Sequence, residues 1–179
     1  MAPLLALVDA GHDVALVVSR ADRRRGRNAE PTPSPVKAAA LAAGLAVTDR
    51  IEDAVEAVRP AADLGVVVAY GRLIKAPVLG AFPMVNAHFS LLPRWRGAAP
   101  VERAILAGDR ETGVCLMVIE EGLDTGGVYA RRAVPIASDE TADHLRARLV
   151  AIASEMLVPL LAGGAAGLGS PEPQVGEPT

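Results

Sequence analysis

The stretch that decides the fold is Gly65-Val66-Val67-Val68-Ala69-Tyr70. Its continuous apolar run has the length of one strand, as is typical of a strand that helices cover on both faces. Extended and helical segments alternate around it. We predict a helix that opens at Ser34-Pro35 and runs through Ala43, and a shorter strand at residues 84–89. The alternation predicts an α/β fold with a Rossmann-like, doubly wound and mostly parallel sheet.

Hydrophobic periodicity and turn residues place the other elements. We expect helices at residues 2–9, 98–107 and 138–161, strands at 13–19, 112–120 and 128–136, and a mobile loop at 20–33. Residues 1–163 should form one catalytic domain, and residues 164–179 a linker or frayed tail rich in Gly, Pro, Ser and Glu. Because the first predicted element is a helix, and this architecture usually opens with a strand, we expect the sequence to be truncated at its N-terminus.

Composition excludes several classes of protein. The 179 residues are 51% hydrophobic, enough for one core, and the net charge of −3 excludes a generally basic, nucleic-acid-coating protein. Cys115 is the only cysteine, which excludes an internal disulfide and indicates a reducing, cytoplasmic setting. No apolar run approaches the roughly 20 residues of a membrane span. There is no metal-ligand spacing and no dinucleotide-binding glycine pattern, so we predict no metal, nicotinamide or flavin.

Three polar residues stand out in this aliphatic chain. Asn86 and His88 are two residues apart on a predicted strand, so their side chains point to the same face. An amide can donate to a developing oxyanion, and an imidazole can donate or carry a proton. Asp124, from another loop, could hold the imidazole in one tautomer and favour its charged form. This set suits acyl or formyl transfer through a tetrahedral intermediate.

Other interpretations of these residues are weaker. His88 alone would more often be a satisfied core histidine, but Asn86 and the Asp124 loop favour a site. Asp124-Thr125-Gly126 matches an aspartic-protease triplet, yet that chemistry needs two carboxylates and an all-β frame. Neither Ser90 nor Cys115 shows the activation that a nucleophile needs. Trp95 is expected to be a packing residue.

The motifs resemble the formyltransferase family that uses 10-formyltetrahydrofolate. Asn-x-His-x-Ser-Leu-Leu-Pro begins at Asn86, and Gly-Leu-Asp-Thr-Gly begins at Gly122. Within that family, the segments at residues 33–37, 90–100 and 111–114 resemble the methionyl-tRNA formyltransferases. The match covers nearly the whole chain. The opening strand of the family and its C-terminal barrel domain have no counterpart in this sequence.

The resemblance implies a role for each matching position. Asn86 and His88 would polarise the formyl group, and Asp124 would tune His88 and help to remove the proton of the attacking amine. The folate pocket, built largely from backbone, maps to Ala69, Tyr70, Gly71, Arg72, Ser90, Leu91, Leu92, Pro93, Glu120, Glu121, Gly122 and Leu123. A basic loop that engages initiator tRNA maps to Arg23, Arg24, Arg25, Arg27 and Lys37.

The predicted function is therefore formyl transfer from 10-formyltetrahydrofolate to the amino group of methionyl initiator tRNA. Three alternatives stay open: another acceptor amine, such as a nucleotide sugar or glycinamide ribotide; hydrolysis of the formyl donor; and a non-catalytic folate or tRNA binder. The arginine loop could also be a solvated surface. The sequence carries no signal for the oligomeric state.

Overall fold

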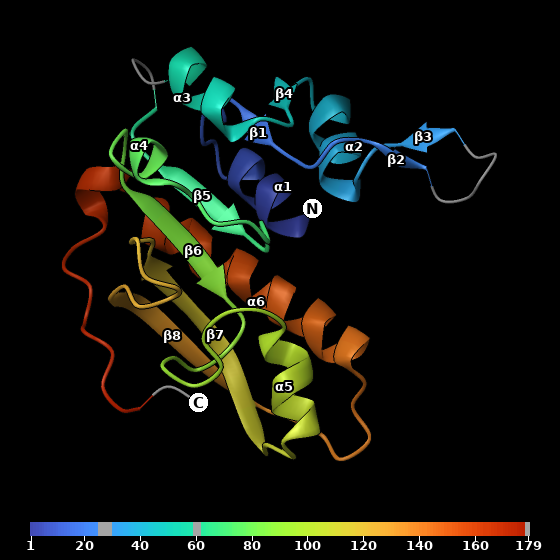
Figure 1. Cartoon of the computed structure of the whole chain (residues 1–179), viewed down its shortest axis with the longest axis vertical. Coiled ribbons are helices and arrows are strands. Elements are labelled where there is room, and N and C mark those ends of the chain that lie inside the picture. Colours follow the sequence, from blue (N-terminus) through green and yellow to red (C-terminus); the bar gives the residue numbers. More distant parts are fainter. Residues whose placement is uncertain (25–29, 59–61, 178–179) are drawn as a thin grey trace. The chain divides into compact units, whose positions relative to one another are not determined.

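The computed structural model describes residues 1–24, 30–58 and 62–177, which form two compact units, Met1–Ala62 and Asp63–Thr179. In the first unit two short strands pair in parallel, Val17 with Val47 and Val18 with Thr48 (Figure 1). Its elements are α1 (Ala2–Asp9), β1 (Val17–Val18), β2 (Arg23–Arg24), β3 (Pro31–Thr32), α2 (Pro35–Ala42), β4 (Val47–Thr48) and α3 (Ile51–Val58).

Helix α2 begins where the sequence predicts. The Ser34 side chain accepts a hydrogen bond from the Lys37 N–H at 3.0 Å, and Pro35 occupies the first turn. The Ser34 hydroxyl also lies 2.6 Å from that of Ser19, and both residues are buried. The predicted loop at residues 20–33 is wrong in part, because β2 and β3 pair as an antiparallel ribbon inside it.

The second unit contains a four-stranded sheet in the order β5-β6-β7-β8. The strand pair β5–β6 is parallel, and β6–β7 and β7–β8 are antiparallel. Its elements are β5 (Gly65–Val68), α4 (Ala76–Leu79), β6 (Met84–His88), α5 (Pro100–Leu106), β7 (Glu111–Val118), β8 (Val128–Pro135), α6 (Ala142–Leu161) and a 3₁₀ turn, η1 (Ala165–Gly167).

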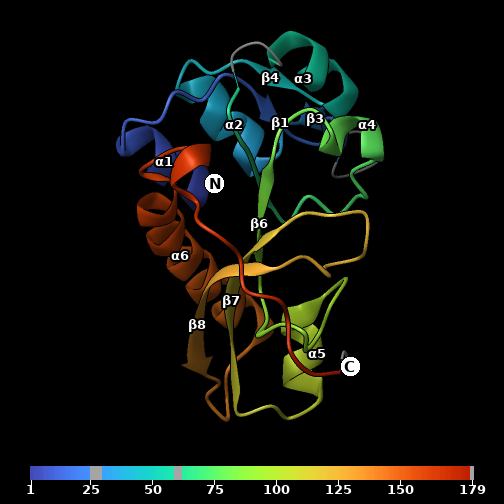
Figure 2. The same cartoon turned by 90° about the vertical axis from the view of Figure 1, so that its left-hand side faces the viewer.

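The two faces of this sheet have different surroundings. Val85 and Ala87 alternate with Asn86 and His88 along β6, and both apolar residues are buried. Helix α6 packs against β7, and the loops at 89–99 and 119–127 lie on the opposite side of the sheet (Figures 1 and 2). The residues that helix α6 buries are Leu145, Leu149, Ala153, Met156, Leu157 and Leu161. None of the helices in the described part of the chain has the length and apolarity to cross a membrane.

The antiparallel half of the sheet follows from a short connection. Strands β7 and β8 are joined by the nine residues 119–127, and a parallel crossover needs a dozen or more. The α/β, Rossmann-like character predicted from the sequence is confirmed. Within the four-stranded sheet the β5–β6 pair is parallel as expected, whereas β6–β7 and β7–β8 are antiparallel. Helix α6 starts at Ala142 and not near 138, because Thr141 caps it by accepting from the His144 N–H at 3.3 Å.

Residues after α6 are tied to the sheet. Glu172 and Val128 exchange two backbone hydrogen bonds of 2.8 and 2.9 Å, and the Leu168 side chain is buried. The segment returns beside the β7–β8 hairpin (Figures 1 and 2). A frayed tail is therefore wrong for the described residues up to 177, whereas a role as a linker and the domain boundary at 163 stay predictions.

Burial of Cys115 predicts a pH-dependent stability. The residue is 0% exposed in a core cluster with Leu92, Met117 and Val128, and burial raises the pKa of its thiol. The unfolded chain ionises this thiol at about pH 8.5 while the folded chain keeps it protonated. The free energy of unfolding should therefore fall as the pH rises above about 8.5. Urea unfolding at pH 7 and pH 9.5 measures this fall, which should be smaller in Cys115→Ala.

Candidate active site

His88 is the last residue of strand β6, and each of its ring nitrogens lies close to an oxygen atom of another residue. Its Nε2 lies 2.9 Å from the Trp95 carbonyl oxygen, which can only accept, so Nε2 carries a proton and donates. Its Nδ1 lies 3.5 Å from Asp124 Oδ2. The imidazole is 6% exposed and the Asp124 carboxylate 18% exposed. Nδ1 is therefore the nitrogen that can take up or release a proton, and it faces a carboxylate when it does so.

The conformation of the Asp124 loop requires glycine at two positions, because a Cβ there would clash with neighbouring atoms. A Cβ at Gly122 would lie 2.2 Å from Thr125 Oγ1, and one at Gly126 would lie 2.1 Å from the Val118 carbonyl oxygen. Asp124 has a φ of 50°, a conformation that non-glycine residues adopt at a cost and that gathers at functional sites. Its Oδ2 accepts a hydrogen bond of 2.8 Å from the Gly97 N–H. The carboxylate is held in place from outside its own loop.

The loop must fold back to bring Asp124 to His88. Strand β7 runs antiparallel to β6, and the Ile119 N–H at its end bonds the Met84 carbonyl at the start of β6. His88 lies at the other end of β6. Asp124 thus reaches His88 because the loop at 119–127 returns over the sheet.

Asn86 occupies the same face of β6 as His88. It is partly buried, and its backbone lies between Val67 of β5 and Met117 of β7. Its side-chain amide makes no hydrogen bond within the described residues. The structure therefore brings His88 and Asp124 together, and places on the same face an amide whose donors are free for a ligand.

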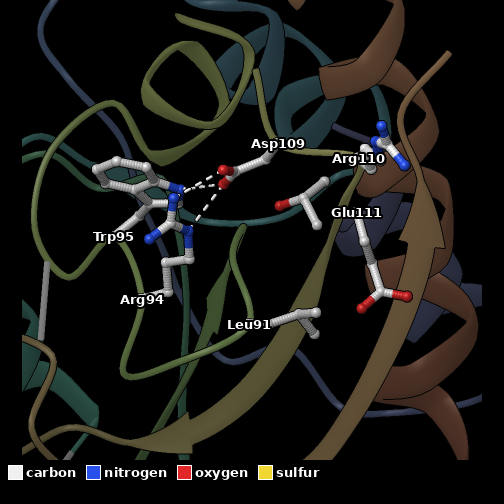
Figure 3. A pocket seen from close by; sticks show the side chains of 7 residues that line it. Leu91, Arg94, Trp95, Asp109, Arg110 and Glu111 are labelled. Carbon is white, nitrogen blue, oxygen red and sulfur yellow. Dashed lines mark hydrogen bonds and ion pairs between the residues drawn. The ribbon is translucent and has the colours of Figure 1, made fainter. Parts of the chain in front are cut away.

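Trp95 is more than the packing residue expected from the sequence, because its carbonyl fixes His88. The Trp95 indole N–H donates to Asp109 at 2.7 Å, and Arg94 donates two hydrogen bonds of 2.7 and 2.9 Å to the same carboxylate (Figure 3). The Arg94 hydrogen bonds lower the pKa of Asp109. The Trp95 ring lies 4.2 Å from the Arg94 guanidinium and 4.6 Å from that of Arg103. This cluster anchors the loop that supplies the His88 acceptor.

A cavity of about 310 Å³ lies against that cluster, lined by Leu91, Arg94, Trp95, Asp109, Arg110, Glu111 and Thr112 (Figure 3). Neither His88 nor Asp124 lines it. The cavity therefore lies apart from the His88–Asp124 pair, whose catalytic role stays a prediction.

Two loops expected to hold the donor carry unpaired backbone. Residues 69–72 follow β5, which is parallel to β6, so they lie at the same edge of the sheet as His88. Residues 123 and 124 form a turn. The backbone groups of Tyr70, Gly71 and Arg72, and those of Glu120 and Glu121, have no hydrogen bond to another described residue. Such groups are what a pterin edge would need. Their assignment to folate remains a prediction.

The third loop expected at the donor site is more buried. Ser90 is 0% exposed and its hydroxyl donates to the Arg94 carbonyl at 2.5 Å, while the Leu92 side chain is 3% exposed in the core. Leu91 and Pro93 are partly exposed. Ser90 and Leu92 therefore serve the shape of the loop, and a role of this segment in binding folate stays a prediction.

The basic residues lie in the first unit. Arg23 and Arg24 form strand β2, and both are exposed. The Lys37 ammonium makes an ion pair of 2.7 Å with Asp22. Arg25 and Arg27 lie outside the described residues. A role of these residues in binding tRNA stays a prediction.

Sequence reasoning also missed Gln174. Its amide lies between the Asp124 loop and Arg96, and it makes two hydrogen bonds to each of them. A glutamine in a segment rich in Pro and Glu gives no sequence signal for such a position.

Comparisons with known proteins show the family of the chain. The model of the Formyl transferase family matches residues 3–161. The chain is 50% identical over 175 residues to a methionyl-tRNA formyltransferase of Halorhodospira halophila, covering 94% of this chain and 56% of that protein. It is 46% identical over 179 residues to one of Heliobacterium modesticaldum, covering 97% and 57%. The chain thus spans a little over half the length of these relatives.

Solved structures support the fold. Glycinamide ribonucleotide transformylase 1 from Symbiobacterium toebii superposes with a TM-score of 0.80 at 24% identity, over 98% of this chain and 89% of that one. The enzyme of that name from Geobacillus kaustophilus gives 0.71 at 27% identity, over 93% and 90%. Since the family model spans most of the chain and the fold agrees, the chain belongs to the formyl transferase family.

Proposed function

We propose that this chain carries the catalytic centre for formyl transfer from 10-formyltetrahydrofolate to the amino group of methionyl initiator tRNA. The observation that carries the proposal is the His88–Asp124 pair, 3.5 Å apart, on the face of the sheet that also holds the unpaired Asn86 amide. Membership of the formyl transferase family supports the reaction class. The names of relatives at 44–50% identity support the acceptor.

The donor would supply an activated formyl group. Backbone groups of residues 69–72 and 120–123 would hold its pterin, and the proposal is supported by those of Tyr70, Gly71 and Arg72, which have no hydrogen bond to another described residue. The Asn86 amide would donate a hydrogen bond to the formyl oxygen, where negative charge develops during transfer. The amine would attack the formyl carbon, and the bond from that carbon to the folate nitrogen would break to release tetrahydrofolate. Asp124 would receive the proton that the attacking amine loses, and His88 would return a proton through Nδ1 to the departing folate nitrogen. A cytoplasmic setting belongs to the same proposal.

The acceptor is tested by comparing different amines in separate reactions. The purified chain is incubated with radiolabelled 10-formyltetrahydrofolate and, separately, with methionyl initiator tRNA, glycinamide ribotide and an amino sugar nucleotide. Label on the tRNA alone supports the proposal. Label on another amine, release of formate in every reaction, or folate binding with no transfer to any acceptor would each contradict it.

The arginines of β2 are expected to contribute to tRNA affinity and not to chemistry. Exposed guanidinium groups neutralise phosphates and release counterions. Replacing Arg23 and Arg24 with alanine should raise the KM for tRNA about 10-fold at low salt and leave kcat unchanged. Initial rates at varied tRNA and salt concentrations measure both effects.

The matched control removes two charges from another pair of adjacent arginines. Arg131 and Arg132 lie side by side on β8 and are 48% and 46% exposed. Replacing both with alanine changes the net charge by the same amount. An equal loss of affinity in the two double variants would mean that overall charge, and not the basic segment, attracts the tRNA.

A further inference from the structure

The segment that follows α6 brings one side chain to the Asp124 loop. Glu172 is fixed by its two backbone hydrogen bonds to Val128. Pro171 lies against Gly127, where an added Cβ would come within 2.9 Å of the proline ring. Gln174 follows two residues later and is partly buried. The chain is therefore anchored immediately before Gln174, and the direction of that side chain is constrained.

The Gln174 amide uses its full hydrogen-bonding capacity. Its Nε2 donates to the Asp124 carbonyl at 2.9 Å and to the Gly126 carbonyl at 2.8 Å. Its Oε1 accepts from Arg96 Nε at 3.0 Å and from Arg96 Nη2 at 2.7 Å. Carbonyls only accept and a guanidinium only donates, so the amide can face its partners in one orientation only. One side chain thus joins three segments of the second unit.

Asp124 is held both by its backbone carbonyl and by its carboxylate. The residue after Arg96 is Gly97, whose N–H binds Asp124 Oδ2. Gln174 therefore ties the backbone of Asp124 to the same segment that holds its carboxylate. Asp124 keeps an unfavourable φ of 50°, and such conformations persist where the surroundings over-determine them. Without the two donated hydrogen bonds, the loop is free to relax and move the carboxylate away from His88.

We propose that Gln174 is a positioning residue for formyl transfer, acting through Asp124. The inference rests on the proposed function, because it assumes that Asp124 takes part in the chemistry. It requires no contact between Gln174 and a substrate.

The decisive variant is Gln174→Glu. Glutamate keeps an acceptor for Arg96, so the segment stays docked, but it replaces the two N–H donors with an oxygen that faces two carbonyls. We expect kcat to fall about 10-fold or more and the KM for 10-formyltetrahydrofolate to change less than about 3-fold. Val175→Ser is the control, because Val175 is the neighbouring residue and is 87% exposed. Wild-type kcat in a folded Gln174→Glu protein would overturn the proposal.

A double-mutant cycle separates this inference from the proposed function. In an Asp124→Ala background, Gln174→Glu should lower kcat by less than about 2-fold, since the residue it positions is gone. The same loss in both backgrounds would show that Gln174 acts independently of Asp124. Wild-type kcat in Asp124→Ala alone would instead refute the role of Asp124 in the proposed function.

A second readout needs no turnover. The chain has three histidines, so the His88 ring nitrogens can be assigned by ¹⁵N NMR. Gln174→Glu and Asp124→Ala should both shift the Nδ1 resonance of His88, and Val175→Ser should leave it in place. An unchanged His88 resonance in Gln174→Glu would contradict the positioning role.

Discussion

Replacing Asp124 with alanine should lower the turnover of formyl transfer by about 100-fold or more. The substitution removes the carboxylate that lies 3.5 Å from His88 Nδ1 and that accepts from the Gly97 N–H. His88 then has no acceptor for a proton on Nδ1, and the Gly97 amide loses its partner. Steady-state kcat with radiolabelled formyl donor and saturating acceptor measures the effect.

Asp124→Asn tests whether turnover depends on the negative charge of the Asp124 side chain or only on its shape. Asparagine can still accept from Gly97, but it carries no negative charge to receive a proton. We expect a loss nearly as large as that in the alanine variant, with a melting temperature close to wild type. Full turnover in Asp124→Asn would show that the carboxylate only shapes the loop.

Removing the Asn86 amide should have an effect of similar size. Asn86→Ala deletes the donor that we assign to the formyl oxygen, and loss of one such donor lowers kcat by about 10²- to 10³-fold in known cases. Because the amide has no hydrogen bond within the described residues, its removal breaks no hydrogen bond among them. The free energy of unfolding should therefore change little, as urea titration can measure.

Asn86→Asp supplies the matched comparison. Aspartate has nearly the same shape, but when ionised it only accepts hydrogen bonds. It should be at least as inactive as alanine, since it places a negative charge where negative charge develops. Turnover near wild type in either Asn86 variant would refute the assignment.

The sequence predicted those parts of the molecule that depend on local signals. Ser34 and Pro35 mark the start of α2, and Ser34 makes the expected capping bond. The β6 strand carries Asn86 and His88 because its residues alternate. The pairing of His88 with Asp124 was predicted from the chemistry of an imidazole and a carboxylate and from the family resemblance, since no local signal links residues so far apart in sequence.

What the sequence did not predict depends on contacts between distant segments. The ribbon at Arg23–Arg24 and Pro31–Thr32 lacks apolar residues, and a two-residue strand gives no periodicity. The role of Trp95 is performed by its carbonyl oxygen, a group that every residue has. Gln174 makes its hydrogen bond to Asp124 across 50 positions of the chain. None of these features has a local signature.

Asp124 is hydrogen-bonded to Gly97, 27 positions away in the sequence, and to Gln174, 50 positions away. The residues of the site are therefore synthesised at different times. During synthesis the strand bearing His88 emerges long before Gln174. A growing chain that already contains α6 would still lack the last of these hydrogen bonds. Contacts of such sequence separation form late, after loop closure has been achieved. Competence for chemistry should therefore arise after the sheet itself has formed, which makes enzymatic rate a sensitive reporter of the final step of folding.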